Sequence, residues 1–245
     1  MPIPSYAVGD PAPVERVVVV NAHPDDVDFA SAGTIAHWTA TGTEVTYLIL
    51  TDGQAGGFDD DTDRSTVPAI RRDEQCRAAA AVGVDDVRFL GGVDGELVVT
   101  PHLVREISAV IRSVQPQRVL SQSPEREWEM LHRSHPDHLA AGEATVQAIY
   151  PASRNPYAFP ELREQGLEAW VVPELWLAAH PHVNHAVDVT DTFERKLEAL
   201  LCHRSQHPDP DNLRRDMHAG LHATAGRHGL QTGRLAEEYF VVSLP

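Results

Sequence analysis

Basic residues are scarce in this chain of 245 residues, which has 20 Lys and Arg against 36 Asp and Glu and a formal net charge of −16. Such an excess of acidic groups repels a phosphate backbone and an anionic membrane surface, so we expect neither nucleic acid nor membrane as a partner. Long apolar runs are also missing, because the runs at 17–20 and 45–50 are too short to span a bilayer. Residues 1–13 lack the basic and apolar regions of a signal peptide. These absences predict a cytoplasmic protein.

Cysteine is nearly absent. Cys76 and Cys202 are the only two, and both fall inside segments with helical spacing. This excludes a disulfide framework and argues against a thiolate metal site. A glycine-rich G-x-G-x-x-G loop is missing after the first predicted strand, which disfavours a dinucleotide-binding fold.

Short apolar runs and helical periodicity alternate along the chain. The predicted strands are 16–21, 44–50, 86–90, 118–121, 174–178 and 186–189, and the predicted helices are 27–40, 68–82, 103–114, 135–149 and 191–203. Such alternation predicts an α/β, Rossmann-like three-layer fold with a mostly parallel sheet. We expect one domain over 1–245, with a core at about 14–204; the tail 205–245 gives no clear assignment.

Two similar motifs lie where predicted strands give way to helices. The first strand ends in N-A-H-P-D-D at 21–26, and H-P-D-H follows at 135–138, after the fourth strand. Each alone can be explained as a helix start, with Pro in the first turn and Asp as a cap. Both motifs, however, are expected at the carboxyl edge of the sheet, where α/β proteins bind ligands. Two imidazoles and one carboxylate with an open position are typical of hydrolytic zinc, although Fe(II) oxygenases use the same set.

Through these motifs the chain resembles the PIG-L/LmbE-like family of zinc-dependent N-acetylglucosaminyl deacetylases. The matching segments are AHPDD at 22–26, LILTDGQAGG at 48–57, RRDEQCRAAAAVGV at 71–84 and HPDH at 135–138, with a weaker match at 187–200. Gln54 departs from the family pattern, in which Glu is common at this position. The resemblance implies a deacetylase that hydrolyses an N-acetyl group of an amino sugar or glycoside.

The resemblance also implies residue roles. His23, Asp26 and His138 would coordinate Zn²⁺, with another divalent ion such as Fe²⁺ as the alternative. Asp25 would be the general base, and His135 would assist as an acid or as an oxyanion partner. General chemistry agrees, because a metal lowers the pKa of bound water toward ~7 and an adjacent carboxylate can take its proton.

Other residues near the predicted edge are candidates for supporting roles. We expect Asp137 to orient one of the histidines. Asp94, Arg71 and Arg72 are predicted to contact the substrate, since they follow the third strand and open the helix after the glycine-rich loop. The alternative for the arginines is an ion pair on a solvated helix face, and for Asp94 a simple turn.

Several residues look like candidates by chance. The cluster of His180, His182 and His185 is expected to be structural or to lie at the rim of the site, and the H-P-D repeat at 207–209 is expected to be a loop. Trp128, Trp170 and Trp176 are expected to serve packing.

The sequence therefore predicts an enzyme acting on a small N-acetylated molecule. An amidase for a non-sugar natural-product amide and an inactive sugar-binding module are the alternatives. The presence of Asp25 argues against the inactive module, because a binding site needs no base. A homo-oligomer is compatible with the sequence, which does not determine the oligomeric state.

Overall fold

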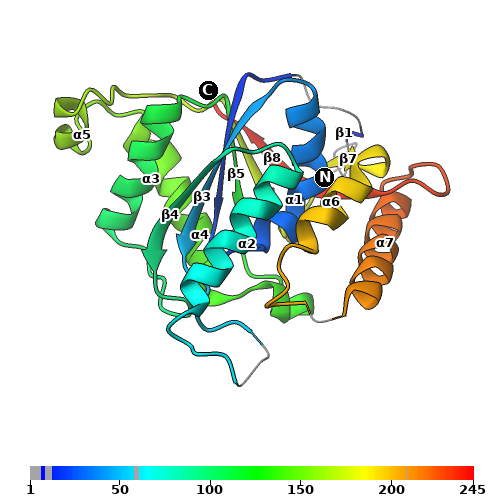
Figure 1. The fold of residues 1–245 in the computed structure, drawn as a ribbon. Coiled ribbons are helices and arrows are strands. Elements are labelled where there is room, and N and C mark those ends of the chain that lie inside the picture. The colour runs from blue at the N-terminus through cyan, green and yellow to red at the C-terminus, as the bar shows by residue number, and fades with distance from the viewer. Residues whose placement is uncertain (1–6, 9–12, 58–60, 208) are drawn as a thin grey trace.

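The computed structural model describes residues 7–8, 13–57, 61–207 and 209–245 (Figure 1). The strands are β1 (Ala7–Val8), β2 (Arg16–Asn21), β3 (Glu44–Thr51), β4 (Asp86–Gly92), β5 (Arg118–Gln122), β6 (Glu174–Ala178), β7 (His185–Asp188) and β8 (Ala236–Ser243). The helices are α1 (Asp26–Ala40), α2 (Val67–Ala81), α3 (Pro101–Val114), α4 (Pro136–Gln147), α5 (Pro160–Glu164), α6 (Phe193–Leu200) and α7 (Pro210–Arg227). Shorter helical turns are η1 (Trp128–Arg133), η2 (Ala148–Ser153) and η3 (Thr190–Thr192).

The described strands form one eight-stranded sheet in the order β1-β7-β8-β6-β5-β2-β3-β4. Neighbouring strands pair in parallel from β4 across to β6, and β1 is parallel to β7. Only β8 is antiparallel to its neighbours, β6 on one side and β7 on the other. The sheet is therefore mostly parallel, as the sequence predicts.

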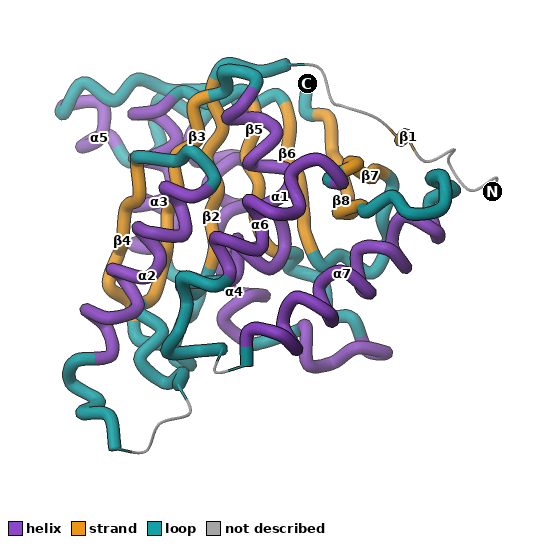
Figure 2. The backbone as a smooth tube through the Cα atoms, turned by 45° about the vertical axis from the view of Figure 1, so that its right-hand side comes forward, coloured by secondary structure: helices purple, strands orange, loops and turns teal. Residues whose placement is uncertain are grey.

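Two apolar cores lie on opposite faces of the sheet. Side chains alternate along β2, so Val17 and Val19 pack in one core with α1 and α2, whereas Val18 and Val20 pack in the other with α3 and α4. Figures 1 and 2 show helices covering both faces of the sheet. The predicted three-layer α/β fold is confirmed.

Several boundaries differ from the sequence-based expectations. The predicted helix 135–149 ends as α-helix at Gln147 and continues as η2, and the predicted helix 191–203 divides into η3 and α6. The unassigned tail contains α7 and β8. Within the described ranges, no helix combines the length and apolar composition that a bilayer-spanning segment requires.

Candidate metal centre and active site

The first motif occupies the turn between β2 and α1. Asp25 is the N-cap residue of α1 and has a positive φ of 91°. Its neighbour Asp26 accepts a hydrogen bond from the backbone N–H of His23 at 2.7 Å. This tight turn holds the imidazole of His23 beside the carboxylate of Asp26.

The second motif opens α4, and β5, the strand before it, pairs directly with β2. His135 is the N-cap residue, and its Nδ1 accepts a hydrogen bond from the backbone N–H of Asp137 at 3.2 Å. Gly142 lets α4 approach the end of β5, because a Cβ there would lie 2.5 Å from the carbonyl oxygen of Gln122. The two motifs thus meet at one edge of the sheet.

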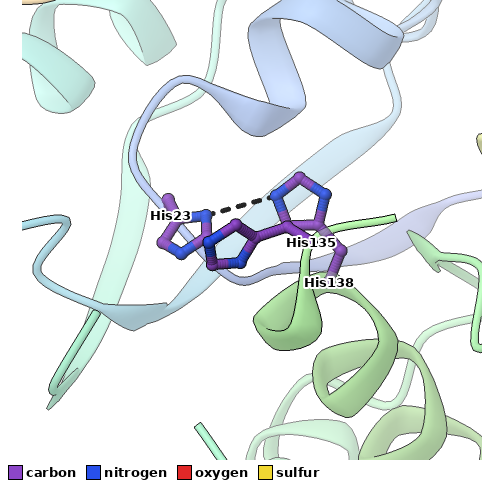
Figure 3. Close-up of side chains that lie close together, drawn as sticks. All are labelled: His23, His135 and His138. Carbon is purple, nitrogen blue, oxygen red and sulfur yellow. Dashed lines mark hydrogen bonds between the residues drawn. The ribbon is translucent and has the colours of Figure 1, made fainter. Parts of the chain in front are cut away.

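Donor atoms from both motifs converge at this edge (Figure 3). Nδ1 of His23 lies 3.2 Å from Nε2 of His138. The two oxygens of the Asp26 carboxylate contact the two rings separately: Oδ2 lies 3.2 Å from Nδ1 of His23, and Oδ1 lies 3.0 Å from Nε2 of His138. Zinc bonds of about 2.0–2.1 Å in a tetrahedron separate ligand atoms by about 3.3 Å, so the two imidazole nitrogens have the spacing of zinc ligands and the Asp26 carboxylate lies beside both. His135 also belongs to the cluster, since ligand atoms of His23, His135 and His138 lie within 4.8 Å of one another.

Two carboxylates fix the orientation of the His23 ring. Nε2 of His23 lies 3.0 Å from Oδ1 of Asp94 and 3.1 Å from Oδ2 of Asp137. Asp137 is held in turn by the backbone N–H groups of Gly95, at 2.7 Å, and Leu97, at 3.2 Å. A carboxylate neighbour implies that Nε2 carries the proton, which leaves the lone pair of Nδ1 for a metal. Asp137 therefore contacts a histidine, and its orienting role stays a prediction.

The charges at this edge favour a cation. Burial alone would lower the pKa of His23, but hydrogen bonds and charge interactions with Asp26 and Asp94 raise this pKa to about 11. Burial would raise the pKa of Asp26, but the imidazoles of His138 and His23 lower it overall. The pKa of His138 is raised by Asp26 in spite of burial. The carboxylates hold protons on the imidazoles, and a divalent ion would replace those protons.

Asp25 has different surroundings from Asp26. Its Oδ2 accepts a hydrogen bond from Nη2 of Arg71 at 3.0 Å. Burial raises the pKa of Asp25 to about 7, with Arg71 opposing the shift. Adjacent carboxylates thus occupy two environments, one among imidazoles and one beside a guanidinium.

The guanidinium of Arg71 is enclosed by the protein. Arg71 is 3% exposed and donates to the carbonyl oxygens of Gly53, at 2.8 Å, and Pro24. Gly53 has a positive φ of 60°, and a Cβ there would lie 2.2 Å from Nη1 of Arg71. The glycine-rich loop is therefore shaped around this side chain.

The other predicted substrate residues differ in exposure. Arg72 has a 43% exposed side chain and pairs with the carboxylate of Asp52 at 2.8 Å. Asp94 accepts a hydrogen bond from the backbone N–H of Ala55 at 3.1 Å in addition to its contact with His23. Substrate contact stays a prediction for Arg71, Arg72 and Asp94.

The additional histidine cluster contributes to packing. His180 stacks on Phe240 with ring centroids 4.3 Å apart, and the ring of His185 meets Trp176 edge-on. The candidate metal groups found among the described residues include neither of them. In the H-P-D repeat, His207 packs edge-on against Phe29, whereas Pro208 lies outside the described residues.

The three tryptophans predicted to serve packing do not behave alike. Trp176 is 1% exposed and belongs to a core, and Trp170 is partly buried. Trp128 is 78% exposed, so the packing prediction is wrong for this residue. It lies on η1 at the surface, where the guanidinium carbon of Arg126 is 5.6 Å from the centre of its ring.

Two buried groups behind Asp25 were not among the predicted site residues. Gln75 accepts a hydrogen bond from the backbone N–H of Asp25 at 2.8 Å, and His203 contacts Asp28 at 2.8 Å. Gln75 looks like any polar residue of a helix, and His203 lies far along the chain. Gln75 lies in the segment 71–84 that resembles the family, but neither residue has the spacing of a ligand motif, so the sequence assigned a role to neither.

Known proteins resemble this chain in sequence and in architecture. A family model described as "PIG-L: GlcNAc-PI de-N-acetylase" matches residues 18–149. Diacetylchitobiose deacetylase of Thermococcus kodakarensis is 33% identical over 200 residues, which cover 80% of this chain and 72% of that protein. Probable N-acetyl-alpha-D-glucosaminyl L-malate deacetylase 2 of Bacillus cereus is 34% identical over 213 residues, which cover 84% of this chain and 89% of that protein.

The structural similarity extends over nearly the whole chain. N,N'-diacetylchitobiose deacetylase from Pyrococcus horikoshii, solved with an inhibitor, superposes with a TM-score of 0.86 at 27% identity, covering 94% of this chain and 84% of that chain. The family match spans both HPD motifs, and the chain superposes on the Pyrococcus enzyme over 94% of its length. The resemblance seen in the sequence is confirmed: the chain belongs to the PIG-L family.

Proposed function

We propose that this protein is a metal-dependent N-deacetylase that hydrolyses the acetamide of an amino sugar or glycoside. The observation that carries the proposal is the pair of imidazole nitrogens of His23 and His138, 3.2 Å apart, with an oxygen of the Asp26 carboxylate 3.0–3.2 Å from each and the carboxylate of Asp25 next in sequence. The similar deacetylases from Thermococcus and Bacillus, named for N-acetylated amino sugars, support the substrate class.

Nδ1 of His23, Nε2 of His138 and the carboxylate of Asp26 would hold the metal, which we propose to be Zn²⁺. Two imidazoles and one carboxylate form a ligand set that zinc hydrolases use, whereas Fe²⁺ is the alternative for the same set. Such an ion supplies Lewis acidity, which makes a water molecule more acidic and polarises the acetyl carbonyl group. Asp94 and Asp137 keep His23 in the tautomer that presents Nδ1.

Asp25 takes a proton from the attacking water and returns it to the sugar nitrogen as the amide bond breaks. Its burial raises its pKa to about 7, which suits a group that must both accept and release a proton near neutral pH. The ion pair with Arg71 fixes one carboxylate oxygen. A water molecule must approach the other one.

His135 stabilises the oxyanion that develops from the acetyl carbonyl oxygen. Its Nδ1 accepts a hydrogen bond from the backbone N–H of Asp137, so the proton of the neutral ring is on Nε2. Burial and the nearby imidazoles of His23 and His138 lower the pKa of His135, which favours the neutral form. A neutral imidazole that donates from a fixed position is suited to this role.

Asp94, Arg71 and Arg72 remain our proposed contacts to sugar hydroxyl groups. Asp94→Ala should raise KM for a glycoside if the carboxylate holds the sugar. Asp94 also contacts His23 at 3.0 Å, so metal content must be measured in the same variant. Reduced metal content with an unchanged KM would assign Asp94 to the support of His23 instead.

The test uses metal analysis together with acetate release from N,N'-diacetylchitobiose and from N-acetylglucosamine glycosides. We expect about one divalent ion per chain, lost in His23→Ala and His138→Ala, because each removes a protein ligand. Asp25→Asn should keep the ion and lose about 10²–10⁴-fold in kcat. Ser108→Ala, a buried change on α3, is the control. Full metal content in both histidine variants would refute the site, and cleavage of non-sugar amides alone would favour the amidase alternative.

A further inference from the structure

Gln75 connects Asp25 to a second buried carboxylate. The side chain of Gln75 is fully buried on α2. Its Oε1 accepts a hydrogen bond from the backbone N–H of Asp25 at 2.8 Å, and its Nε2 donates to Oδ2 of Asp28 at 2.9 Å. The backbone N–H can only donate and the carboxylate can only accept, so these two partners permit a single orientation of the Gln75 amide.

His203 completes the chain of contacts from the far side. Its Nε2 lies 2.8 Å from the same Oδ2 atom of Asp28, and both side chains are fully buried. The segment that carries His203 is tied to α2 as well, because the backbone N–H and hydroxyl group of Ser205 donate to Glu74 at 2.9 and 2.7 Å. Five buried or partly buried hydrogen bonds therefore run between this segment, α2 and the turn that contains Asp25.

The backbone of Asp25 requires such support. A positive φ, here 91°, is uncommon for a residue with a side chain and persists where surrounding contacts hold it. The Gln75 amide satisfies the N–H group that this conformation directs into the protein. Without that acceptor, a buried N–H would be left unpaired, and the turn would relax toward an ordinary conformation.

We propose that Gln75, Asp28 and His203 are positioning residues that hold the backbone of Asp25 in its positive-φ conformation and so direct its carboxylate toward the reacting water. The inference rests on the proposed function, in which Asp25 is the base. His203 orients Asp28, Asp28 orients the amide of Gln75, and the amide fixes Asp25. None of the three side chains needs to touch the substrate.

A purely structural role makes different predictions. If these contacts only join α1, α2 and the segment 203–206, removing them would lower thermal stability. Any resulting decrease in rate would then multiply with the decrease caused by a substitution at Asp25. Positioning through Asp25 instead lowers kcat, leaves KM and metal content unchanged, and has no further effect once the base is removed.

The experiment compares Gln75→Met, which removes both hydrogen bonds, with His203→Leu and with His203→Gln, whose amide can still donate to Asp28. We expect kcat to fall about 10–100-fold in Gln75→Met and His203→Leu, the range found for residues that orient a catalytic group. His203→Gln should recover most of the loss. Ser153→Ala is the matched control, because this fully buried hydroxyl bonds to carbonyl oxygens remote from the site.

Double variants and amide exchange decide the outcome. Gln75→Met added to Asp25→Asn should cause no further loss of the residual rate, and the Asp25 amide should lose protection from hydrogen exchange in Gln75→Met. An unchanged kcat, or a full multiplication of the two losses, would overturn the proposal. If Gln75→Met does not fold, His203→Leu tests the same chain of contacts.

The parent protein and Asp25→Asn separate this inference from the proposed function. A parent without deacetylase activity, or a fully active Asp25→Asn variant, contradicts the proposed function. In that case, hydrogen exchange of the Asp25 backbone amide still tests the inference, because the exchange rate depends on the hydrogen bond to Gln75 and not on the reaction. A protected Asp25 amide in Gln75→Met would contradict the positioning itself.

Discussion

Removing the charge of Lys196 should destabilise the fold severely. Lys196 is fully buried on α6, and its Nζ donates to the carbonyl oxygens of Asp28 at 2.7 Å and Phe29 at 2.6 Å. Its third partner is Oε1 of Glu237 at 2.8 Å, and the exposed fractions of the two charged side chains are 0% and 1%. The pair joins the first turn of α1 to β8.

The size of the effect follows from the charge that would be left behind. In Lys196→Met, Glu237 keeps hydrogen bonds from the backbone N–H groups of Gly33 and Thr34 and from the hydroxyl group of Tyr239, but it loses the ammonium group that balances its charge. Breaking a buried pair from one side costs about 3–5 kcal/mol. At roughly 2–4 °C per kcal/mol for a chain of this size, Tm should fall by about 6–20 °C.

Thermal unfolding of three variants tests this reasoning. The double variant Lys196→Met with Glu237→Gln should be more stable than Lys196→Met alone, because no unpaired charge stays buried. Arg214→Met is the control, since it breaks an exposed pair with Glu194 and should leave Tm unchanged. A Tm for Lys196→Met within 2 °C of the parent, or a double variant less stable than the single one, would refute the reasoning.

Three further predictions concern single side chains. Trp176→Ala should cost about 3–5 kcal/mol in unfolding free energy, because its indole is 1% exposed, whereas Trp128→Ala, at 78% exposed, should unfold at the parent temperature. Burial lowers the pKa of His207 to about 4, so the unfolded chain binds a proton that the folded chain resists, and stability should fall as pH drops from about 6.5 to 4. His207→Gln should show a smaller drop in Tm between pH 7 and pH 5; an equal drop contradicts this assignment. Asp137→Asn should weaken zinc binding about 10–100-fold in a chelator competition, since Asp137 orients His23; unchanged affinity would remove that role.

Most of the fold could be predicted because its central elements carry strong local signals. The strands Arg16–Asn21 and Glu174–Ala178 have the same first and last residues in the structure as in the prediction. Strands that are buried over nearly their whole length appear in the sequence as apolar runs between turns. Helix α7 could not be assigned, because only Leu221, Thr224 and Ala225 are buried along it and no apolar face is visible in the sequence. Strand β8 joins the sheet between β6 and β7, and such long-range pairing leaves no local pattern.

The candidate site was predictable where its residues form motifs. His23, Asp26 and His138 lie in two H-P-D segments, and the parallel pairing of β2 with β5 brings these segments together. Gln75 and His203 were not predictable, because their roles arise from contacts with backbone and with Asp28 that no spacing reveals. Motifs therefore identified the groups that we propose to hold a metal, and only the structure identified the groups that we propose to support them.

The place of β8 in the sheet has a consequence for synthesis. β6 and β7 are translated well before β8, yet both pair with it and not with each other. Until β8 has left the ribosome, the N–H and C=O groups along one edge of β6 have no strand partner, and such edges promote aggregation of nascent chains. The ammonium group of Lys196 likewise lacks the carboxylate of Glu237 until β8, which contains Glu237, has been translated. Truncations that remove β8 should therefore accumulate as insoluble protein even though every residue of the proposed metal site has been translated.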